Sequence, residues 1–139
     1  MIVNIDNWNE QELSMHFIGS VFSLLKFTNR KYNLFAERAL SGIVDGEEIS
    51  GLPDGIIAKG FREPEIPYFC LHEYKRESDP NGYPAGQCLA GMLVAQGLNL
   101  PNTPLYGCYV KGRMWFFMAL EGHQYSITEV VIIHVVKNY

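Results

Sequence analysis

Two acidic side chains and one amine occur at a spacing that a pair of adjacent strands would bring together. Glu73 and Lys75 stand one residue apart in the strand-like run 67–75, and alternate residues of a strand project from the same face, about 6 to 7 Å apart. If the run 55–59 pairs with this strand, Asp54 lies near Glu73. The sequence therefore predicts a small volume that contains two carboxylates and one ammonium group.

This combination of groups suits metal-assisted hydrolysis of a phosphodiester. Mg²⁺ is commonly held by one or two carboxylates and keeps several water molecules. A lysine beside the metal can orient or deprotonate the attacking water, because burial and a nearby cation lower the pKa of an ammonium group. We therefore take Asp54 and Glu73 as candidate ligands of Mg²⁺ or Mn²⁺, and Lys75 as the group that positions or activates the water.

Each of these residues also has a simpler interpretation. Asp54 follows Pro53 and is flanked by glycines, which suits a turn in which the Asp side chain bonds to its own backbone. Glu73 and Lys75 at a solvated strand end would form an ion pair worth about 0 to 1 kcal/mol. The occurrence of all three residues in one ordered set favours the catalytic interpretation.

The same ordered set resembles the signature of the PD-(D/E)xK nuclease superfamily. Pro53-Asp54 is followed, after 18 residues, by Glu73-Tyr74-Lys75, and the resemblance covers roughly residues 10–127 of the single domain expected for 1–139. It implies a restriction-endonuclease-like fold, which is an α/β domain with an α-β-β-β-α-β core and a central mixed sheet flanked by helices. It also implies that Asp54 and the Glu-Tyr-Lys triplet lie on the second and third strands.

The resemblance adds two further candidate site residues. Some members of the superfamily carry a glutamine on the helix that follows, where this chain has Gln87, and many use an acidic residue from the first helix or first strand, for which Glu37 is the candidate here. Gln87 would hold a water, a phosphate oxygen or Lys75, although it could equally satisfy backbone groups at the start of its helix. Glu37 would add a metal ligand.

The flanking sequence predicts the elements that hold these residues in place. Asn9 can cap a helix, with Glu12 completing a capping box, and an apolar stripe at helical spacing follows at Leu13, Phe17, Val21, Leu24 and Leu25. Asp45-Gly46 predicts a tight turn between the runs 34–44 and 47–58, which we expect to pair as a β-hairpin.

The strand that carries the Glu-Tyr-Lys triplet should present two different faces. By simple alternation, Phe69, Leu71, Glu73 and Lys75 share one face. An apolar face that ends in a charged pair indicates a strand that runs from the core into a cleft.

The C-terminal half predicts one helix and a meander of strands. Pro84 suits the first turn of a helix through Leu98, whose apolar residues lie on two sides. The runs 105–110 and 114–120 flank a turn, and 130–136 favours a further strand because it is rich in β-branched residues. Since Trp115 and Phe117 alternate with two other apolar residues, both faces of this ribbon should be covered.

Composition bounds the class of protein. The 139 residues are 47% hydrophobic and 19% charged, which indicates a globular chain. No run approaches the roughly 20 apolar residues of a membrane helix, and the acidic start lacks the features of a signal peptide. We therefore expect a cytoplasmic protein that does not bind membranes, with Cys70, Cys88 and Cys108 as thiols of the core.

The net charge of −4 is unusual for a protein that binds nucleic acid, because affinity for DNA comes largely from neutralising phosphates. Basic residues nevertheless fall in or near the proposed site elements, at Lys59, Arg62, Lys75, Arg76, Lys111 and Arg113. A local basic face can therefore coexist with an acidic whole, and DNA remains the expected partner.

The expected assembly and chain length follow from the resemblance. Cutting both strands of a duplex usually requires two active sites, which is consistent with a homodimer. Many members of the superfamily have further elements, so a chain that stops at Tyr139 is consistent with a minimal core or with a trimmed C-terminus.

Two other functions compete with a nuclease. The first is a non-catalytic domain of the same fold that binds a protein or a nucleic acid, which the short length and acidic total favour. The second is a small-molecule-binding domain in which the aromatic ribbon around Trp115 forms the wall of a closed apolar cavity. Metal binding at Asp54 and Glu73 would separate the first of these from the enzyme.

Overall fold

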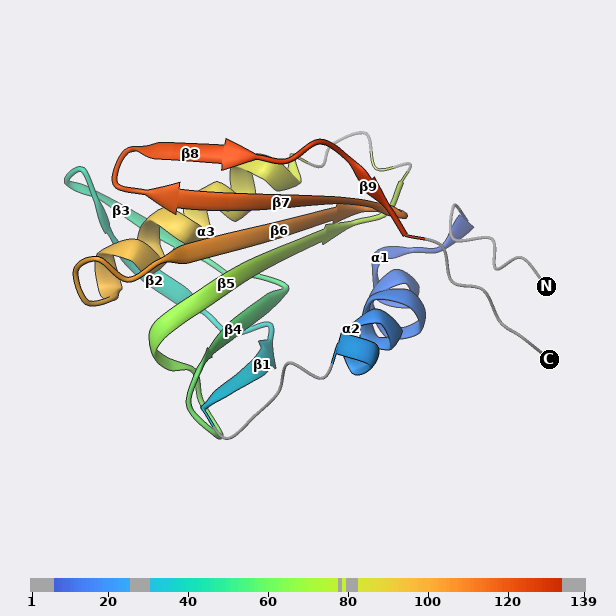
Figure 1. Cartoon of the computed structure of the whole chain (residues 1–139), viewed down its shortest axis with the longest axis horizontal. Helices are drawn as coiled ribbons and strands as arrows, with labels where there is room; N and C mark the ends of the chain where they lie inside the picture. Colours follow the sequence, from blue (N-terminus) through green and yellow to red (C-terminus); the bar gives the residue numbers. More distant parts are fainter. Residues whose placement is uncertain (1–6, 26–30, 78, 80–82, 134–139) are drawn as a thin grey trace.

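A mixed β-sheet with helices packed on it forms the described part of the chain, residues 7–25, 31–77, 79 and 83–133 of a computed structural model (Figure 1). Its strand order is β1-β4-β5-β6-β7-β8, and β9 also pairs with β7. β5 and β6 run parallel, whereas the other neighbours run antiparallel. The bounds are Tyr32–Ala36 for β1, Gly55–Lys59 for β4, Glu65–Lys75 for β5, Leu105–Lys111 for β6, Met114–Glu121 for β7, Gln124–Ile127 for β8 and Val131–Ile132 for β9. The expected α/β class with a mixed sheet is thus confirmed.

The N-terminal helical segment begins at the predicted cap. It consists of α1 (Glu10–Glu12), the π-helical turn η2 (Leu13–Ile18) and α2 (Gly19–Leu25). Asn9 and Glu12 form the capping box, with backbone-to-side-chain hydrogen bonds of 2.8 and 2.9 Å. Leu13, Phe17 and Ile18 are buried, while the side chains of Leu24 and Leu25 lie outside the described residues.

The predicted hairpin forms around its turn but is shorter than expected. β2 (Leu40–Val44) pairs with β3 (Glu47–Gly51) through the Asp45-Gly46 turn, in which both residues have positive φ. The flanking runs instead pair with each other in the main sheet as β1 and β4. The chain divides in this way because Phe35 and Ile56 are buried in the core of the main sheet.

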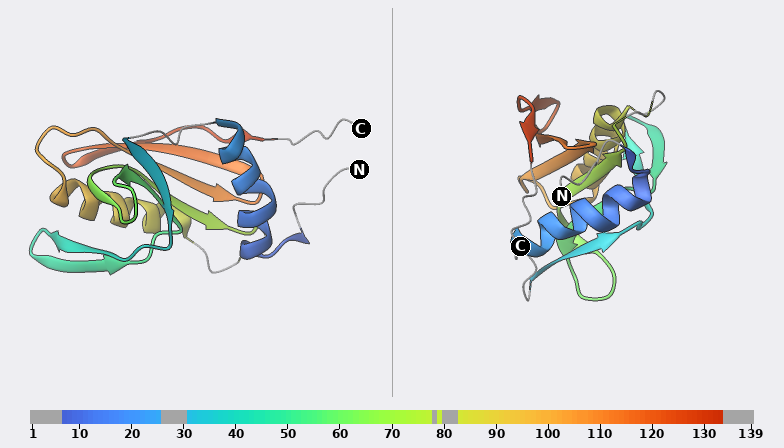
Figure 2. Two further views of the ribbon diagram at one scale, coloured as in Figure 1. Left: turned by 90° about the horizontal axis from the view of Figure 1, so that it is seen from below. Right: turned by 90° about the vertical axis from the view of Figure 1, so that its right-hand side faces the viewer.

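The helix α3 (Pro84–Leu98) connects the parallel strands β5 and β6 and begins at the predicted proline. It packs against β5 and β6 on one side and against the β2–β3 hairpin on the other, so its two apolar sides are both used. The left view of Figure 2 shows α3 between the hairpin and the sheet. Gly107 permits this close packing, because a Cβ at that position would lie 2.5 Å from the Met92 sulfur.

Two hydrophobic clusters fill the two sides of the sheet. The larger lies between the sheet and α3 and includes Leu71, Met92 and Met118. The smaller lies between the sheet and the N-terminal helical segment and includes Phe17, Tyr74 and Trp115. The three cysteines are free and buried, as predicted for core thiols, and burial raises the pKa of each.

Alternation along β5 fails at one position. Ile57 pairs with Cys70 but Ala58 pairs with Tyr68, so Phe69 is an extra residue in a β-bulge. Tyr68 packs with the α3-side cluster, and the Phe69 ring contacts Tyr106 of β6. The expectation that Phe69 shares a face with Leu71 is therefore wrong, because the bulge shifts the alternation by one residue.

The C-terminal strands form the predicted meander through β6, β7 and β8. Of the strand expected over 130–136, Val131–Ile132 is extended as β9, and residues 134–136 lie outside the described residues. In the described part of the chain, no helix is both long enough and apolar enough to cross a membrane.

Candidate active site

The pairing of β4 with β5 brings Asp54 and Glu73 together. Asp54 directly precedes β4, whose first residue, Gly55, pairs with His72. The backbone N–H of Tyr74 donates to Asp54 Oδ2 at 2.6 Å, and a hydrogen bond joins the Asp54 and Glu73 carboxyl groups. The two carboxyl groups are thus held by backbone pairing and not only by flexible side chains.

The carboxyl pair shares a proton because of its surroundings. Burial, together with the charge and hydrogen bond of the adjacent Asp54, raises the pKa of Glu73 to about 8. Burial also raises the pKa of Asp54, opposed by the hydrogen bond from Tyr74 N–H. Near neutral pH, Glu73 is therefore protonated and donates a hydrogen bond to the Asp54 carboxylate, and the pair carries about one negative charge.

Lys75 lies beside this pair and forms an ion pair with Glu10. Its Nζ is 3.3 Å from Glu10 Oε1, and its side chain is 18% exposed. Burial acts to lower the pKa of Lys75, but the hydrogen bond and charge of Glu10, with the charges of Asp54 and Glu73, raise it overall. Lys75 is therefore a cation at neutral pH.

Glu10 is a site residue that sequence reasoning missed. It occupies the first turn of α1, directly after the Asn9 cap. Its charge acts on Asp54, Glu73 and Lys75 alike. The signal was available, because the resemblance asks for an acid from the first helix and Glu10 opens the first predicted helix.

Glu37, which the sequence predicts as a further metal ligand, contacts Asp54 through its backbone. It is exposed in the turn after β1, with φ of 50°, and its N–H donates to the Asp54 carbonyl at 3.3 Å. Among the described residues, no three or more His, Cys, Asp or Glu side chains are placed to hold a metal ion. Glu37 therefore does not complete such a group with Asp54 and Glu73.

Gln87 lies in the first turn of α3 and is exposed. Its backbone N–H donates to the Tyr83 carbonyl at 3.2 Å. The next residue, Cys88, points into the core, where the Glu73 charge acts on its thiol. Within the described ranges, no hydrogen bond joins the Gln87 amide to the carboxyl pair.

A small cavity of about 200 Å³ opens beside Asp54. Its walls come from the N-terminal helical segment and β1, and include Ile18, Phe22, Leu34 and Tyr74. Behind it, Phe22 stacks on the buried His72 with ring centroids 5.1 Å apart, and His72 Nδ1 is 2.9 Å from the Tyr74 hydroxyl. Burial lowers the pKa of His72 to about 4, so this histidine is a neutral support.

The carboxyl pair has the chemistry of a Mg²⁺ or Mn²⁺ site. Both groups are oxygen ligands, and one or two carboxylates are sufficient for Mg²⁺. A divalent cation would displace the proton that Asp54 and Glu73 share, because ligands bind metal in their deprotonated form. The metal would complete its coordination with water and substrate oxygens.

Comparisons with known proteins provide no relative for this chain. No protein-family model matches the sequence, and neither a curated protein nor a solved structure matches it. Any function must therefore be inferred from the chain itself.

Proposed function

We propose that this chain is a metal-dependent nuclease that hydrolyses phosphodiester bonds in DNA with Mg²⁺ or Mn²⁺. The observation that carries the proposal is the hydrogen-bonded Asp54–Glu73 carboxyl pair with the Lys75 cation beside it. Strongly shifted pKa values at a partly buried carboxyl pair are typical of functional sites. A divalent cation is the ligand that their chemistry fits best.

The order of elements supports a restriction-endonuclease-like fold. The N-terminal helical segment, β1, β4, β5, α3 and β6 follow one another in the α-β-β-β-α-β order, with the β2–β3 hairpin as an insertion after the first strand. Asp54 stands at the start of the second core strand and the triplet at the end of the third. Neighbouring strands β5 and β6 are parallel and joined by a helix, as that core requires.

The roles of the residues follow from their positions. Asp54 and Glu73 would hold the metal, which when bound supplies a Lewis acid and a water of lowered pKa. Lys75, a cation at neutral pH, would stabilise the charge that develops on the phosphate and orient the attacking water. Glu10 is the acid of the N-terminal helical segment that acts on the site, because it pairs with Lys75 and its charge acts on both carboxyl groups.

Gln87 and Glu37 have assisting roles in this proposal. Gln87 is exposed at the start of α3, where its amide would contact a substrate phosphate or a metal-bound water. Glu37 lines the same cavity as Asp54 and would contact the metal through water, since among the described residues it forms no three-residue metal group with Asp54 and Glu73. We also propose a cytoplasmic location, which the three free buried thiols favour.

The alternative is a non-catalytic domain of the same fold that binds a protein or a nucleic acid. The small number of carboxylates at the site favours it, because no three-residue metal group forms in the described part of the chain. The third possibility, a cavity walled by Trp115, has less support, since Trp115 is 1% exposed within the core. The cavity beside Asp54 is not lined by it.

Titration of Mn²⁺ in a calorimeter tests the proposal directly. We expect one site in the wild-type chain, and loss of binding in Asp54→Ala and Glu73→Ala. Glu121→Gln, which changes an exposed acid at the end of β7, should bind like the wild type and serves as the matched control.

The same four proteins should be incubated with plasmid and single-stranded DNA. We expect metal-dependent cleavage by the wild type and the control, and none by the two alanine variants. Mn²⁺ binding without cleavage of either substrate would contradict the enzyme, and absence of binding would favour the non-catalytic alternative.

A further inference from the structure

Among the described residues, one face of the sheet is covered at only one end. The N-terminal helical segment packs on this face over Tyr74, Val110 and Trp115, near the ends of β5 and β6. Figure 1 looks onto this face, with α3 behind the sheet and the strands continuing past the helical segment. The expectation that both faces of the β6–β7 ribbon are covered is therefore wrong, because Phe117 on this face is 43% exposed.

The uncovered half of the face carries aromatic rings in contact with one another. Phe69 lies between Tyr32 of β1 and Tyr106 of β6, with ring centroids 5.7 and 5.3 Å away, and the rings are tilted by 50° and 56°. Phe69 and Tyr106 are 40% and 42% exposed. We call Tyr32, Phe69 and Tyr106 the aromatic row.

The bulge in β5 creates this row. It places Phe69 on the face opposite Leu71, where simple alternation would have buried it against α3. Asn99 at the end of α3 holds the bulge, since its side chain accepts from Tyr68 N–H and donates to Tyr68 C=O, both at 2.8 Å. The exposed position of Phe69 is thus fixed by the two part-buried hydrogen bonds between Asn99 and the Tyr68 backbone.

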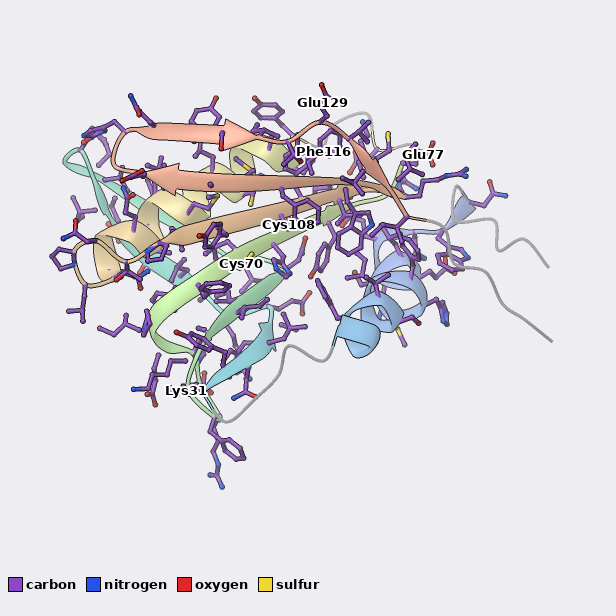
Figure 3. All side chains as sticks on the ribbon, viewed as in Figure 1. Lys31, Cys70, Glu77, Cys108, Phe116 and Glu129 are labelled. Carbon is purple, nitrogen blue, oxygen red and sulfur yellow. The ribbon has the colours of Figure 1, made fainter. Side chains whose placement is uncertain are left out.

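Charge near the row suits an anionic ligand at one end. The exposed Lys59 pairs in register with Tyr32 and so shares its face, and Lys31 precedes Tyr32 at the same corner of the sheet (Figure 3). Acidic residues of the same face stand at strand ends, with Glu65 opposite Lys59 and Glu121 at the end of β7. Between these ends, the large exposed side chains of β5, β6 and β7 on this face are the rings of Phe69, Tyr106 and Phe117.

The row is continuous with the candidate active site. Leu34 is two residues from Tyr32 on the same side of β1, is 36% exposed, and lines the cavity that also contains Asp54. Asp54 is the member of the carboxyl pair that lines this cavity, because Glu73 alternates with Leu71 and projects from the α3 side of β5. A flexible chain that rests on the row can therefore extend past Leu34 to Asp54.

From these observations we propose that the aromatic row is a stacking platform for single-stranded nucleic acid, and that it delivers this substrate to the Asp54–Glu73 site. The second part rests on the proposed nuclease function. Unpaired bases stack on exposed rings irrespective of sequence, whereas the bases of a duplex are already stacked inside. Stacking also gives affinity without many phosphate contacts, which accords with a net charge of −4.

Fluorescence anisotropy of labelled oligonucleotides tests the platform in EDTA, where no metal-dependent cleavage occurs. The probes are oligo(dT), oligo(rU) and a DNA duplex of equal length, mixed with the whole chain. We expect both single strands to bind more tightly than the duplex. Phe69→Ala and Tyr106→Ala should each weaken single-strand binding by about 5- to 100-fold, the usual cost of losing one stacked base.

Matched variants separate stacking from folding. Phe69→Tyr and Tyr106→Phe keep the rings and should bind like the wild type. Tyr125→Ala removes a 55% exposed ring from β8, where Tyr125 pairs with Leu120 of the α3-side cluster, and should also bind like the wild type. Thermal unfolding of every variant checks that the fold is intact.

Three results would overturn the platform: no single-strand binding by the wild type, equal binding by the alanine variants, or a wild-type dimer that Phe69→Ala dissociates. The last would mean that a second copy of the chain covers the row. Ring-dependent binding together with no cleavage would leave the platform standing and remove the nuclease. Cleavage of duplex DNA together with equal binding by the alanine variants would overturn the platform and support the nuclease.

Discussion

The candidate site consists of groups whose charges depend on one another. Glu10 holds Lys75 in an ion pair, and the charges of both act on Asp54 and Glu73. Because Lys75 stays protonated, its natural task is to stabilise negative charge, and a role as the base that removes a proton from water fits less well. The structure thus favours charge stabilisation by Lys75 over proton removal, two roles that the sequence did not distinguish.

The raised pKa of Glu73 should make the stability of the metal-free chain depend on pH. The pKa rises from 4.5 to about 8 on folding, so the folded chain binds this proton more tightly. The resulting stability is complete below pH 4.5 and is lost as the pH rises through 8. We expect the melting temperature to fall between pH 6.5 and 8, and Glu73→Gln to remove most of this slope.

The buried histidine acts in the opposite direction over the lower part of this interval. Burial lowers the pKa of His72 from 6.5 to about 4, so loss of the proton from the unfolded histidine makes stability rise with pH, an effect nearly complete by about pH 7.5. Scanning calorimetry of wild type, Glu73→Gln and Glu121→Gln at several pH values makes the measurement. An equal slope in wild type and Glu73→Gln would contradict the shared proton.

Among the elements, β5 contributes most to the site because it reaches from the bulge to the triplet. Its last three residues supply Glu73 of the carboxyl pair and the Lys75 cation, while its bulge turns Phe69 toward the open face. The end of α3 stabilises the bulge through Asn99, which is 9% exposed. One strand thus connects the proposed chemistry to the proposed platform.

Replacement of Asn99 by alanine should therefore have two effects. It leaves the Tyr68 N–H and C=O without their partners, which we expect to cost about 1 to 3 kcal/mol of unfolding free energy. It should also weaken single-strand binding, because Phe69 is no longer held outward. Urea unfolding and anisotropy measure the two effects, and Ser41→Ala, an exposed change in β2, is the control. Unaltered stability would show that water replaces Asn99 fully.

At the scale of the whole molecule, the fit between α3 and the sheet limits what Gly107 can become. A Cβ there would lie 2.5 Å from Met92 Sδ and 2.9 Å from Cys88 Sγ. We expect Gly107→Ala to destabilise the chain by about 1 to 3 kcal/mol through overpacking. Gly51→Ala, where a Cβ meets nothing within 4 Å, should be nearly neutral. Urea unfolding compares them, and equal stability would mean that Met92 moves aside at little cost.

Local chemistry made part of this fold predictable from sequence. The Asn9–Glu12 capping box, the Asp45-Gly46 turn and Pro84 each act within a few residues, and each marks an element boundary in the structure. The proximity of Asp54 and Glu73 was also predicted, because it needs only one antiparallel pairing.

What could not be predicted depends on contacts between distant segments. The bulge at Phe69 requires Asn99, which follows it by 30 residues, and no alternation pattern contains that information. Glu10 meets Lys75 only because the N-terminal helical segment packs on that end of the sheet. Glu37 was predicted as the acid from the first helix or first strand, and in the structure its backbone N–H bonds to the Asp54 carbonyl.

The insertion of the β2–β3 hairpin between β1 and β4 has a consequence for the order of folding. We expect the Asp45-Gly46 turn to close the hairpin first, which would bring Ala36 opposite Gly55 and allow β1 and β4 to pair. Each closure spans only a short loop and costs little chain entropy. Because α3 lies between the parallel strands β5 and β6 in sequence, we expect that pair to form later. Asp54 would then be in place before the last strands complete the sheet around it.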